Sequence, residues 1–301
     1  MKKETEIKLK QFGDLESNVS FKNLTTFRVG GIARNVFYPR NIFGLTNAIS
    51  ICRQEDIPFK VLGNGSNILA SDDDFEGLII KLTRYFIDYY FDDEYLYAQC
   101  GCSLIALSYK AMEMSLSGLE FANGIPATLG GALFMNAGAY KYEMSDVVDE
   151  VQVLVDDDVM WLTKDQCQFS YRSSIFQRHP EWTIVSCKLK LKKGENEAIQ
   201  QLVNSRREKR RSTQPLNFPS AGSTFRNPEG SFAWKYIDEI GYRGKKIGGA
   251  QVSEKHSNFI INTGNATAGD IRKLADEIIE KVKKEHNIEL KMEVEKFNWK
   301  E

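Results

Sequence analysis

The pattern of hydrophobic and polar residues over the first 82 positions predicts a strand, a helix and a second strand. Residues 36–38 form a short apolar run, and Asn41, a residue type preferred at helix N-caps, precedes a stretch with helical spacing. The second strand, Phe59–Leu62, runs into the segment Gly63–Asn67. Ligands commonly bind where the strands of such α/β units end, so this segment is a candidate ligand loop. The apolar residues of the expected helix are Ile42, Leu45, Ile49 and Ile51.

Residues 83–212 follow a different pattern, in which stretches typical of β-hairpins are mixed with two helices. The triplet Asp156–Asp158 is typical of a solvated hairpin turn, and the last helix ends in the basic run Arg206–Arg211. The predicted elements are strands at 87–91 and 95–99, a helix at 103–117, strands at 147–155, 159–162 and 182–191, and a helix that begins near 195.

Beyond Pro215 the chain is rich in Gly, Ser and Asn before regular patterns resume. The patterns predict a helix at 233–240, strands at 247–252 and 259–261, and a last helix capped by Thr267 with Asp270. That helix is expected to bury Ile271, Leu274, Ile278, Ile279 and Val282 on one face. A final strand is expected to turn Ile288, Leu290, Met292 and Val294 inward and Glu289, Lys291, Glu293 and Glu295 outward.

These changes of pattern divide the 301 residues into three predicted domains, 1–82, 83–212 and 213–301. Forty Lys and Arg residues balance 41 Asp and Glu residues, so no field of the whole molecule favours nucleic acid or anionic lipid. The chain start leads into no apolar segment, which predicts a cytoplasmic protein without a membrane span. The cysteines form no CxxC pair and predict neither disulfides nor a metal site: they are Cys52, Cys100, Cys102, Cys167 and Cys187.

Three glycine-rich segments precede residue 140: Gly63–Asn67, Gly124–Gly131 and Asn136–Gly138. Glycine lets backbone N–H groups approach and surround a phosphate, although any one of these segments alone is more typical of a tight turn. Three of them together favour a dinucleotide ligand. Neither GxGxxG nor GxxxxGK[ST] occurs there, so the sequence supports neither a Rossmann domain nor a P-loop.

Seven segments between about residue 20 and residue 297 carry a more specific resemblance to one known family. In the same order as in that family, these segments resemble UDP-N-acetylenolpyruvoylglucosamine reductases. They are Asn23–Gly31, Val61–Asn67, Gly118–Pro126, Gly130–Tyr140, Tyr171–Ser174, Ala221–Pro228 and Ile247–His256. The short stretch between Arg172 and Ser223 resembles the family's second type. Ala127 departs from the family's usual glycine, and Met292–Phe297 departs from its usual carboxyl-terminal pattern.

The resemblance implies an α+β fold of the vanillyl-alcohol-oxidase type, with two domains that hold FAD and a third that covers the substrate. It implies NADPH-dependent, FAD-mediated reduction of UDP-N-acetylglucosamine enolpyruvate to UDP-N-acetylmuramate. Separately, we expect the protein to be a monomer. Non-covalent FAD agrees with the first two glycine-rich segments, which contain no His or Cys. The cofactor-binding residues implied are Gly63, Asn64, Gly65, Ser66, Asn67, Gly124, Ile125, Pro126, Gly130, Gly131, Asn136 and Gly138.

The resemblance also implies three catalytic residues, Ser223, Arg172 and Glu293. Ser223 would protonate the carbon next to the one that receives hydride, and Arg172 would hold the substrate carboxylate. Glu293 would orient a donor or a water, or share protonation. Taken singly, each residue also has an ordinary interpretation: a turn serine, a surface ion pair and a solvated strand carboxylate.

Four further residues match substrate-side positions of the family or lie beside them: Arg210, Arg211, Asn227 and His256. Arg210 or Arg211 is expected to help neutralise the UDP diphosphate, although such a basic run is usually a solvated helix end. Two other functions remain open at this point. One is an FAD oxidase or dehydrogenase of the same fold with a different substrate, and the other is a nucleic-acid binder that uses Arg206–Arg211.

Overall fold

The computed structural model describes residues 1–300, which form two compact units. The first unit contains residues 1–17, 35–64 and 76–209, and the second contains residues 18–34, 65–75 and 210–300. The chain therefore passes between the units several times. The division into three domains stays a prediction.

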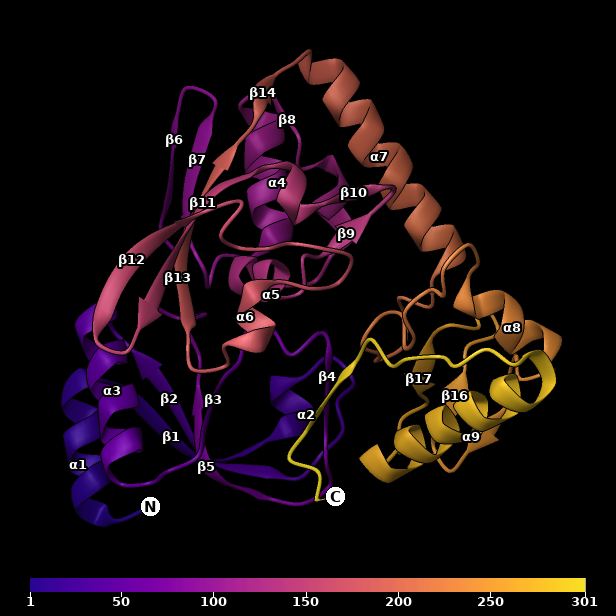
Figure 1. The fold of residues 1–301 in the computed structure, drawn as a ribbon, viewed down its shortest axis with the longest axis horizontal. Helices are drawn as coiled ribbons and strands as arrows, with labels where there is room; N and C mark the ends of the chain where they lie inside the picture. Colours follow the sequence, from indigo (N-terminus) through magenta and orange to yellow (C-terminus); the bar gives the residue numbers. More distant parts are fainter. Residues whose placement is uncertain (301) are drawn as a thin grey trace. The chain divides into compact units, whose positions relative to one another are not determined.

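The amino-terminal part of the first unit is built on a four-stranded sheet in the order β1-β2-β5-β3 (Figure 1). Its strands are β1 (Gly13–Ser20), β2 (Ile32–Pro39), β3 (Phe59–Val61) and β5 (Phe75–Ile80), and its helices are α1 (Lys3–Phe12) and α3 (Ile42–Gln54). The predicted cap of α3 is confirmed, because Asn41 Oδ1 accepts a hydrogen bond from the Gly44 N–H at 2.9 Å. Strands β3 and β5 are parallel, so their carboxyl ends lie at one edge, where the segment Gly63–Asn67 begins.

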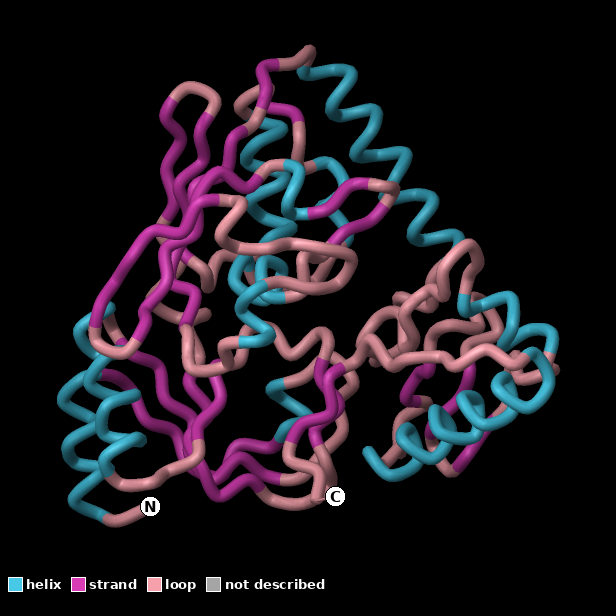
Figure 2. Tube along the Cα trace, in the orientation of Figure 1, coloured by secondary structure: helices cyan, strands magenta, loops and turns pink. Residues whose placement is uncertain are grey.

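The rest of the first unit contains a five-stranded antiparallel sheet in the order β12-β11-β13-β7-β6 (Figure 2). The predicted hairpins are confirmed as β6 (Tyr89–Asp92) with β7 (Tyr95–Gln99) and as β11 (Val148–Val155) with β12 (Asp158–Thr163). The remaining elements are β13 (Thr183–Lys190), α4 (Leu104–Glu113), α5 (Leu129–Phe134), α6 (Ile175–Arg178), the 3-10 helices η1 (Glu120–Gly124) and η2 (Met144–Asp146), and the paired strands β8 (Leu116–Ser117) with β14 (Lys192–Lys193) and β9 (Gly138–Ala139) with β10 (Tyr142–Glu143).

Two helix ends differ from the sequence prediction. Helix α4 ends at Glu113 rather than at residue 117, because Ser115 has a left-handed backbone conformation with φ of 58° and leads into β8. Helix α7 (Asn196–Thr213) continues two residues beyond Arg211, and Pro215 follows shortly after its end. A proline restricts the residue before it to extended conformations, which accounts for the end of the helix.

The second unit contains the short helix α2 (Phe21–Leu24), the parallel pair β4 (Ile68–Ala70) and β18 (Glu295–Phe297), helix α8 (Ala233–Glu239) and helix α9 (Ala268–His286). The strand predicted at 247–252 is in fact a hairpin of β15 (Lys246–Ile247) and β16 (Ala250–Val252), which turns at Gly248 with φ of 52°. β17 (Ile260–Asn262) completes this sheet.

The final strand was predicted over residues 288–295, and only its last residue, Glu295, lies in a strand. The only regular pairing there is a single antiparallel bridge between Met292 and Phe225, and the strand itself is β18 at residues 295–297. The predicted alternation is nevertheless visible in burial, because Leu290 and Val294 are buried while Glu289 and Lys291 are exposed. The segment is therefore extended and packed without forming a continuous ladder.

Helix α9 begins with the predicted capping box. Thr267 Oγ1 accepts from the Asp270 N–H, and Asp270 Oδ2 accepts from the Thr267 N–H, both at 3.0 Å. Its inner face is buried as expected, except that Ile279 is half-buried. The fold combines helices with both antiparallel and parallel strand pairs, which confirms the predicted α+β class. None of the helices in residues 1–300 is long and apolar enough to cross a membrane.

The capping box generates a stability prediction. Replacing Thr267 with Ala removes the acceptor for the Asp270 N–H, and we expect the free energy of unfolding to fall by about 1 kcal/mol. Chemical denaturation of the purified protein measures this change. Lys273→Ala, on the exposed side of the same helix, is the matched control and should shift the midpoint by much less. Equal losses in both variants would contradict a specific role for the cap.

Candidate active site

The segment Gly63–Asn67 follows β3 directly, where the Leu62 N–H donates to the carbonyl oxygen of Ile80 at 2.9 Å. Its glycines are fixed by their neighbours: a Cβ on Gly63 would lie 2.4 Å from Thr128 Oγ1, and Gly65 has φ of 61°. Within residues 1–300, no backbone N–H of this segment donates a hydrogen bond to protein. A run of N–H groups with no protein acceptor is suited to an anionic ligand.

The second glycine-rich segment meets the first inside the same unit. Asn64 Nδ2 donates to the carbonyl oxygen of Pro126 at 2.7 Å, and Thr128 lies between Gly63 and Gly131. Gly130 packs against Cys100, whose Cβ a methyl group on Gly130 would approach to 2.9 Å. Ala127 is accommodated, since its carbonyl oxygen accepts from the Leu104 N–H at 3.0 Å. Gly63 and Asn64, which begin the first predicted segment, thus pack beside the second, Gly124–Gly131.

The third segment is held by Asn136, which is fully buried. Its Nδ2 donates to Glu143 Oε1 at 2.8 Å and to the Ser170 carbonyl oxygen at 3.0 Å, while its Oδ1 accepts from the Ser145 N–H. Its side chain is thus used entirely within the protein. We therefore expect Asn136 to assist cofactor binding only indirectly, by holding its neighbours Ala137 and Gly138 in place.

Arg172 lies at the tip of a tight turn. Ser170 and Ser173 close this turn by exchanging two backbone hydrogen bonds of 3.0 Å, and Arg172 has φ of 54°. A left-handed conformation of a non-glycine residue costs of the order of 1 kcal/mol, and such strain is concentrated at functional sites. Arg172 Nη2 donates to the Gly138 carbonyl oxygen at 2.9 Å. The turn therefore fixes this guanidinium beside the third glycine-rich segment.

Gln177 supports the same turn and was not found from the sequence. Its Nε2 lies 2.9 Å from the Phe134 carbonyl oxygen and 3.1 Å from that of Arg172. The amide thereby connects α5 to the strained residue. A glutamine in a short helix gives no signal of such a role, because its partners are backbone carbonyl groups distant in sequence.

Ser223 and Glu293 lie on neighbouring segments of the second unit. The Glu293 N–H donates to the Thr224 carbonyl oxygen at 2.8 Å, and the Arg226 N–H donates to the carbonyl oxygen of Lys291 at 2.9 Å. Ser223 follows Gly222, which has φ of 76° and open space on its Cβ side. In the part of the chain that the structure describes, the Ser223 hydroxyl has no hydrogen-bond partner, so it is available to donate a proton.

Asn258 fixes the position of Ser223 from the other side. Its Oδ1 accepts from the Phe225 N–H at 3.0 Å, its Nδ2 donates to the Phe225 carbonyl oxygen at 2.8 Å, and its own carbonyl oxygen accepts from the Thr224 N–H at 2.7 Å. This buried residue lies two positions after His256. As with Gln177, the sequence gives no usable signal of this role, because the partners of the amide are backbone groups distant in sequence.

Glu293 is tied to the first glycine-rich segment as well, because Asn67 Nδ2 donates to its carbonyl oxygen at 3.0 Å. The Asn67 carbonyl oxygen in turn accepts from the Glu295 N–H at 2.9 Å. Both glutamates are half-buried rather than fully solvated. The outward positions predicted for these two residues are therefore only partly exposed.

The four predicted substrate-side residues belong to the second unit. Arg210 is half-buried and Arg211 is exposed near the end of α7, where the Arg211 carbonyl oxygen accepts from Lys255 Nζ at 2.5 Å. Asn227 has a structural use, since its Oδ1 accepts from the Ala233 N–H at the start of α8. Earlier in the basic run, the Arg206 guanidinium stacks on Tyr140, 5.2 Å from the ring centroid.

His256 is half-buried and held as a neutral ring. Its Nδ1 lies 3.3 Å from the Asn258 backbone nitrogen, which requires this ring nitrogen to accept, and its ring meets Phe259 edge to face. Burial, with a smaller contribution from the positive charge of Arg243, lowers the pKa of His256 below its ordinary value. Asp238 opposes the shift. The ring therefore presents Nε2 as its donor at neutral pH.

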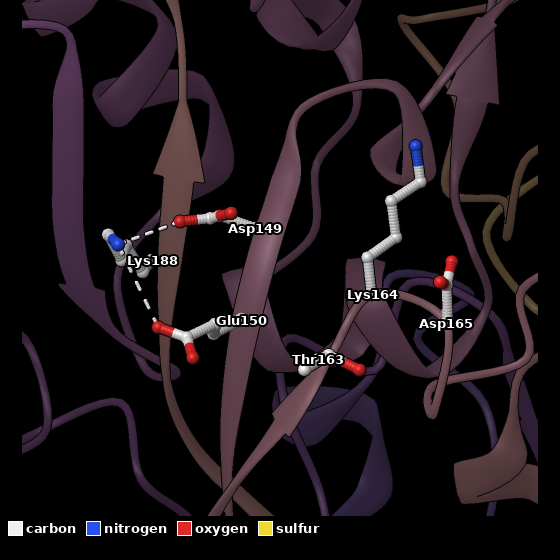
Figure 3. Close-up of a pocket in the computed structure, with 6 residues that line it drawn as sticks. All are labelled: Asp149, Glu150, Thr163, Lys164, Asp165 and Lys188. Atoms are coloured by element: carbon white, nitrogen blue, oxygen red, sulfur yellow. Dashed lines mark ion pairs between the residues drawn. The ribbon is translucent and has the colours of Figure 1, made fainter.

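A charged hollow of about 360 Å³ lies elsewhere on the first unit, on β11, β12 and β13 (Figure 3). Lys188 Nζ lies 2.7 Å from Asp149 Oδ2 and 3.8 Å from Glu150 Oε2, so both carboxylates already have a cation. All three side chains are partly exposed, where such pairs contribute little free energy. The described residues also contain no cluster of metal-binding side chains. This hollow contains none of the predicted site residues.

Comparison with known proteins gives concordant matches over both halves of the chain. A model of the C-terminal domain of UDP-N-acetylenolpyruvoylglucosamine reductase matches residues 214–297, and a model of an FAD binding domain matches residues 33–162. The reductase of Anoxybacillus flavithermus is 39% identical over 94% of each chain. That of Caldanaerobacter subterraneus is 42% identical over 94% of this chain and 93% of its own length. The crystal structure of the Thermus caldophilus reductase aligns with a TM-score of 0.80 at 33% identity, covering 95% of this chain and all of that one.

The environment of His256 generates a pH prediction. We expect its pKa, measured by NMR titration and assigned with His256→Gln, to lie below 6.5. Because the unfolded chain binds this proton more tightly than the folded one, the contribution of the neutral ring to stability is complete above about pH 6.5 and is lost as pH falls through the lowered value. A midpoint at or above 6.5 would contradict the burial argument.

Proposed function

Because this chain belongs to the UDP-N-acetylenolpyruvoylglucosamine reductase family, we propose that it takes hydride from NADPH and that Ser223, Arg172 and Glu293 act on the substrate. The protein is an FAD-dependent oxidoreductase, a UDP-N-acetylmuramate dehydrogenase. It reduces the enolpyruvyl group of UDP-N-acetylglucosamine enolpyruvate during the synthesis of peptidoglycan precursors. Bound FAD supplies the hydride that the side chains of this protein cannot supply.

The first unit offers a set of groups that fits the FAD diphosphate. Gly63 and Asn64 bring backbone N–H groups with no protein acceptor within residues 1–300, and Gly124–Gly131 packs beside them. Peptide N–H groups and small glycine surfaces are the usual means of holding a diphosphate closely. The cysteines of the protein are all buried, and burial raises the pKa of each thiol. This supports flavin that is held without a covalent bond.

The observation that carries the catalytic assignment is that Ser223 and Glu293 lie on neighbouring segments joined by backbone hydrogen bonds. Its hydroxyl has no partner in the described part of the protein, the adjacent Gly222 has open space beside it, and Asn258 fixes the backbone on the other side. A hydroxyl is a weak acid in water, but the carbon left after hydride addition is a far stronger base, so proton transfer is favourable once the geometry is fixed. Ser223 would supply that proton.

The same addition places negative charge on the substrate carboxylate, which takes enolate character. Arg172 has a planar guanidinium suited to grip a carboxylate with two hydrogen bonds, and its turn is fixed before substrate arrives. A charge that is already in position stabilises the developing anion by a few kcal/mol because it need not reorganise. Glu293, tied through its backbone to Thr224 and Asn67, would orient a donor or a water or share the proton with Ser223.

The substrate diphosphate is assigned to Arg210 or Arg211, and His256 and Asn227 are assigned to the substrate side. His256 can donate a hydrogen bond from Nε2. Asn227 would act indirectly, by fixing the start of α8 through its hydrogen bond from the Ala233 N–H. We further propose that the protein works as a monomer in the cytoplasm. The balanced charge of the chain argues against the alternative of a nucleic-acid binder, and the family match argues against an oxidase with another substrate.

Ser223→Ala tests the proposed proton donor by separating the two half-reactions. NADPH should still bleach the flavin at a near-normal rate, because Ser223 takes no part in that step. Reoxidation by UDP-N-acetylglucosamine enolpyruvate should slow by about a hundredfold or more, since the proton donor is missing. Stopped-flow absorbance of the flavin measures both rates in the purified enzyme.

Ser231→Ala is the matched control, since it removes a hydroxyl from a turn of the same unit outside the proposed site. Its two half-reactions should match those of the unsubstituted enzyme. If Ser223→Ala slowed both half-reactions equally, Ser223 would be a structural residue rather than the donor. Failure of the unsubstituted enzyme to bind flavin or consume NADPH would overturn the proposed function as a whole.

A further inference from the structure

Lys81 is a buried lysine whose position none of the family segments includes. It follows β5 directly, and its side chain is only 8% exposed in the first unit. Its Nζ donates one hydrogen bond, of 2.7 Å, to the carbonyl oxygen of Gly63. Its backbone N–H is bonded to the Phe37 carbonyl oxygen at 2.8 Å, so the residue is anchored where β2, β3 and β5 end.

No carboxylate within residues 1–300 pairs with this ammonium group. The neighbouring strands bring cations rather than an anion. On β3, Lys60 Nζ lies 5.9 Å from the centroid of the Phe134 ring. On β2, the ring of Tyr38 lies under the guanidinium of Arg84. The carbonyl of Gly63 is neutral. Burial of an ammonium group without an anion is expensive, so such groups are normally paired or deprotonated. Burial is the cause that lowers the pKa of Lys81 to about 8.

The place of Lys81 indicates which anion could complete the pair. Strands β3 and β5 are parallel, and ligands of α/β sheets bind beyond the carboxyl ends of such strands. The residue whose carbonyl Lys81 holds, Gly63, begins the segment whose N–H groups have no protein acceptor in the described chain. Positive charge and N–H donors without a protein acceptor are therefore found together at one edge of the sheet, and both favour the binding of a phosphate group.

We propose that Lys81 is a cofactor-binding residue, whose ammonium group neutralises a phosphate of the FAD diphosphate while holding the carbonyl of Gly63. This assignment rests on the proposed function, since it takes FAD as the ligand. Of the three donors on the ammonium, one is used by Gly63, and the others remain for phosphate oxygens. The neutral carbonyl and the anionic phosphate would then be bridged by one buried cation.

Lys81→Met tests the assignment. Methionine has a similar length and no charge, so it fills the same space, while the Gly63 carbonyl oxygen loses its hydrogen-bond donor. Purified holoenzyme is dialysed against graded FAD, and the retained flavin gives the dissociation constant. We expect the variant to bind FAD at least about tenfold more weakly than the unsubstituted enzyme, because a charged hydrogen bond is lost. Lys164→Met, an exposed lysine of the same unit, should bind FAD normally.

The pH dependence separates the charge of Lys81 from its hydrogen bond to Gly63. A phosphate raises the pKa of a bound ammonium, so FAD affinity should be constant below about pH 8 and should fall as pH rises through that value in the free protein. This fall should be absent from Lys81→Met. A neutral amine still donates to a carbonyl, so loss of affinity in Lys81→Met without this pH dependence in the unsubstituted enzyme would overturn the assignment.

Equal FAD affinity in Lys81→Met and the unsubstituted enzyme would also overturn it, while leaving the proposed function intact. Failure of the unsubstituted holoenzyme to retain FAD would instead count against the proposed function. Thermal unfolding of the flavin-free variant gives an independent check that the substitution leaves the protein folded. We expect its unfolding midpoint to lie close to that of the flavin-free unsubstituted protein, since removal of the buried charge offsets the hydrogen bond lost at Gly63.

Discussion

A single buried amide, that of Asn258, holds the segment on which the proposed chemistry of the second unit depends. It exchanges two hydrogen bonds with the backbone of Phe225, and its own carbonyl accepts from Thr224. In a buried environment an unpaired amide or peptide group costs 1–3 kcal/mol, so few other arrangements of this segment are compatible with the fold. Ser223 precedes the clamped residues directly. Its position is therefore set by a residue that takes no part in the reaction.

Hydrogen bonds extend from the segment held by Asn258 to two other parts of the chain. The Thr224 carbonyl accepts from the Glu293 N–H, and the Glu293 carbonyl accepts from the Asn67 amide. The strand pair β4 and β18 then continues the connection, with Glu295 opposite Ile68. Side chains that are far apart in sequence thus share one hydrogen-bonded frame. Each hydrogen bond of this frame involves a backbone group. The frame therefore fixes the course of the backbone and does not itself hold the side chains of Ser223 and Glu293.

The sequence predicted local features well where their causes are local. Asn41 and Thr267 cap the helices expected of them, because a cap depends on residues three positions away. The final strand was displaced, because its place is determined by pairing with β4 rather than by its own alternation. Asn258 and Gln177 gave no usable signal, since their partners are distant backbone groups. Lys81 at the end of an apolar strand reads as a solvated strand end, and only the fold reveals that it is buried.

The glycine-rich segments show how packing and function can require the same residue. Gly63 has no room for a Cβ because Thr128 lies against it, whether or not a ligand binds there. Sequence alone could not separate a tight turn from a phosphate site. The structure shows the tight packing of this segment, and the proposed phosphate site would use the same residues. Arg172 and Lys81 differ from Gly63, since each carries a local cost in free energy, a left-handed backbone at Arg172 and a buried charge at Lys81. An anionic ligand would offset the cost at Lys81 and would use the fixed charge of Arg172. A cost of this kind at both positions favours the proposed binding of anions over packing as the reason for their presence.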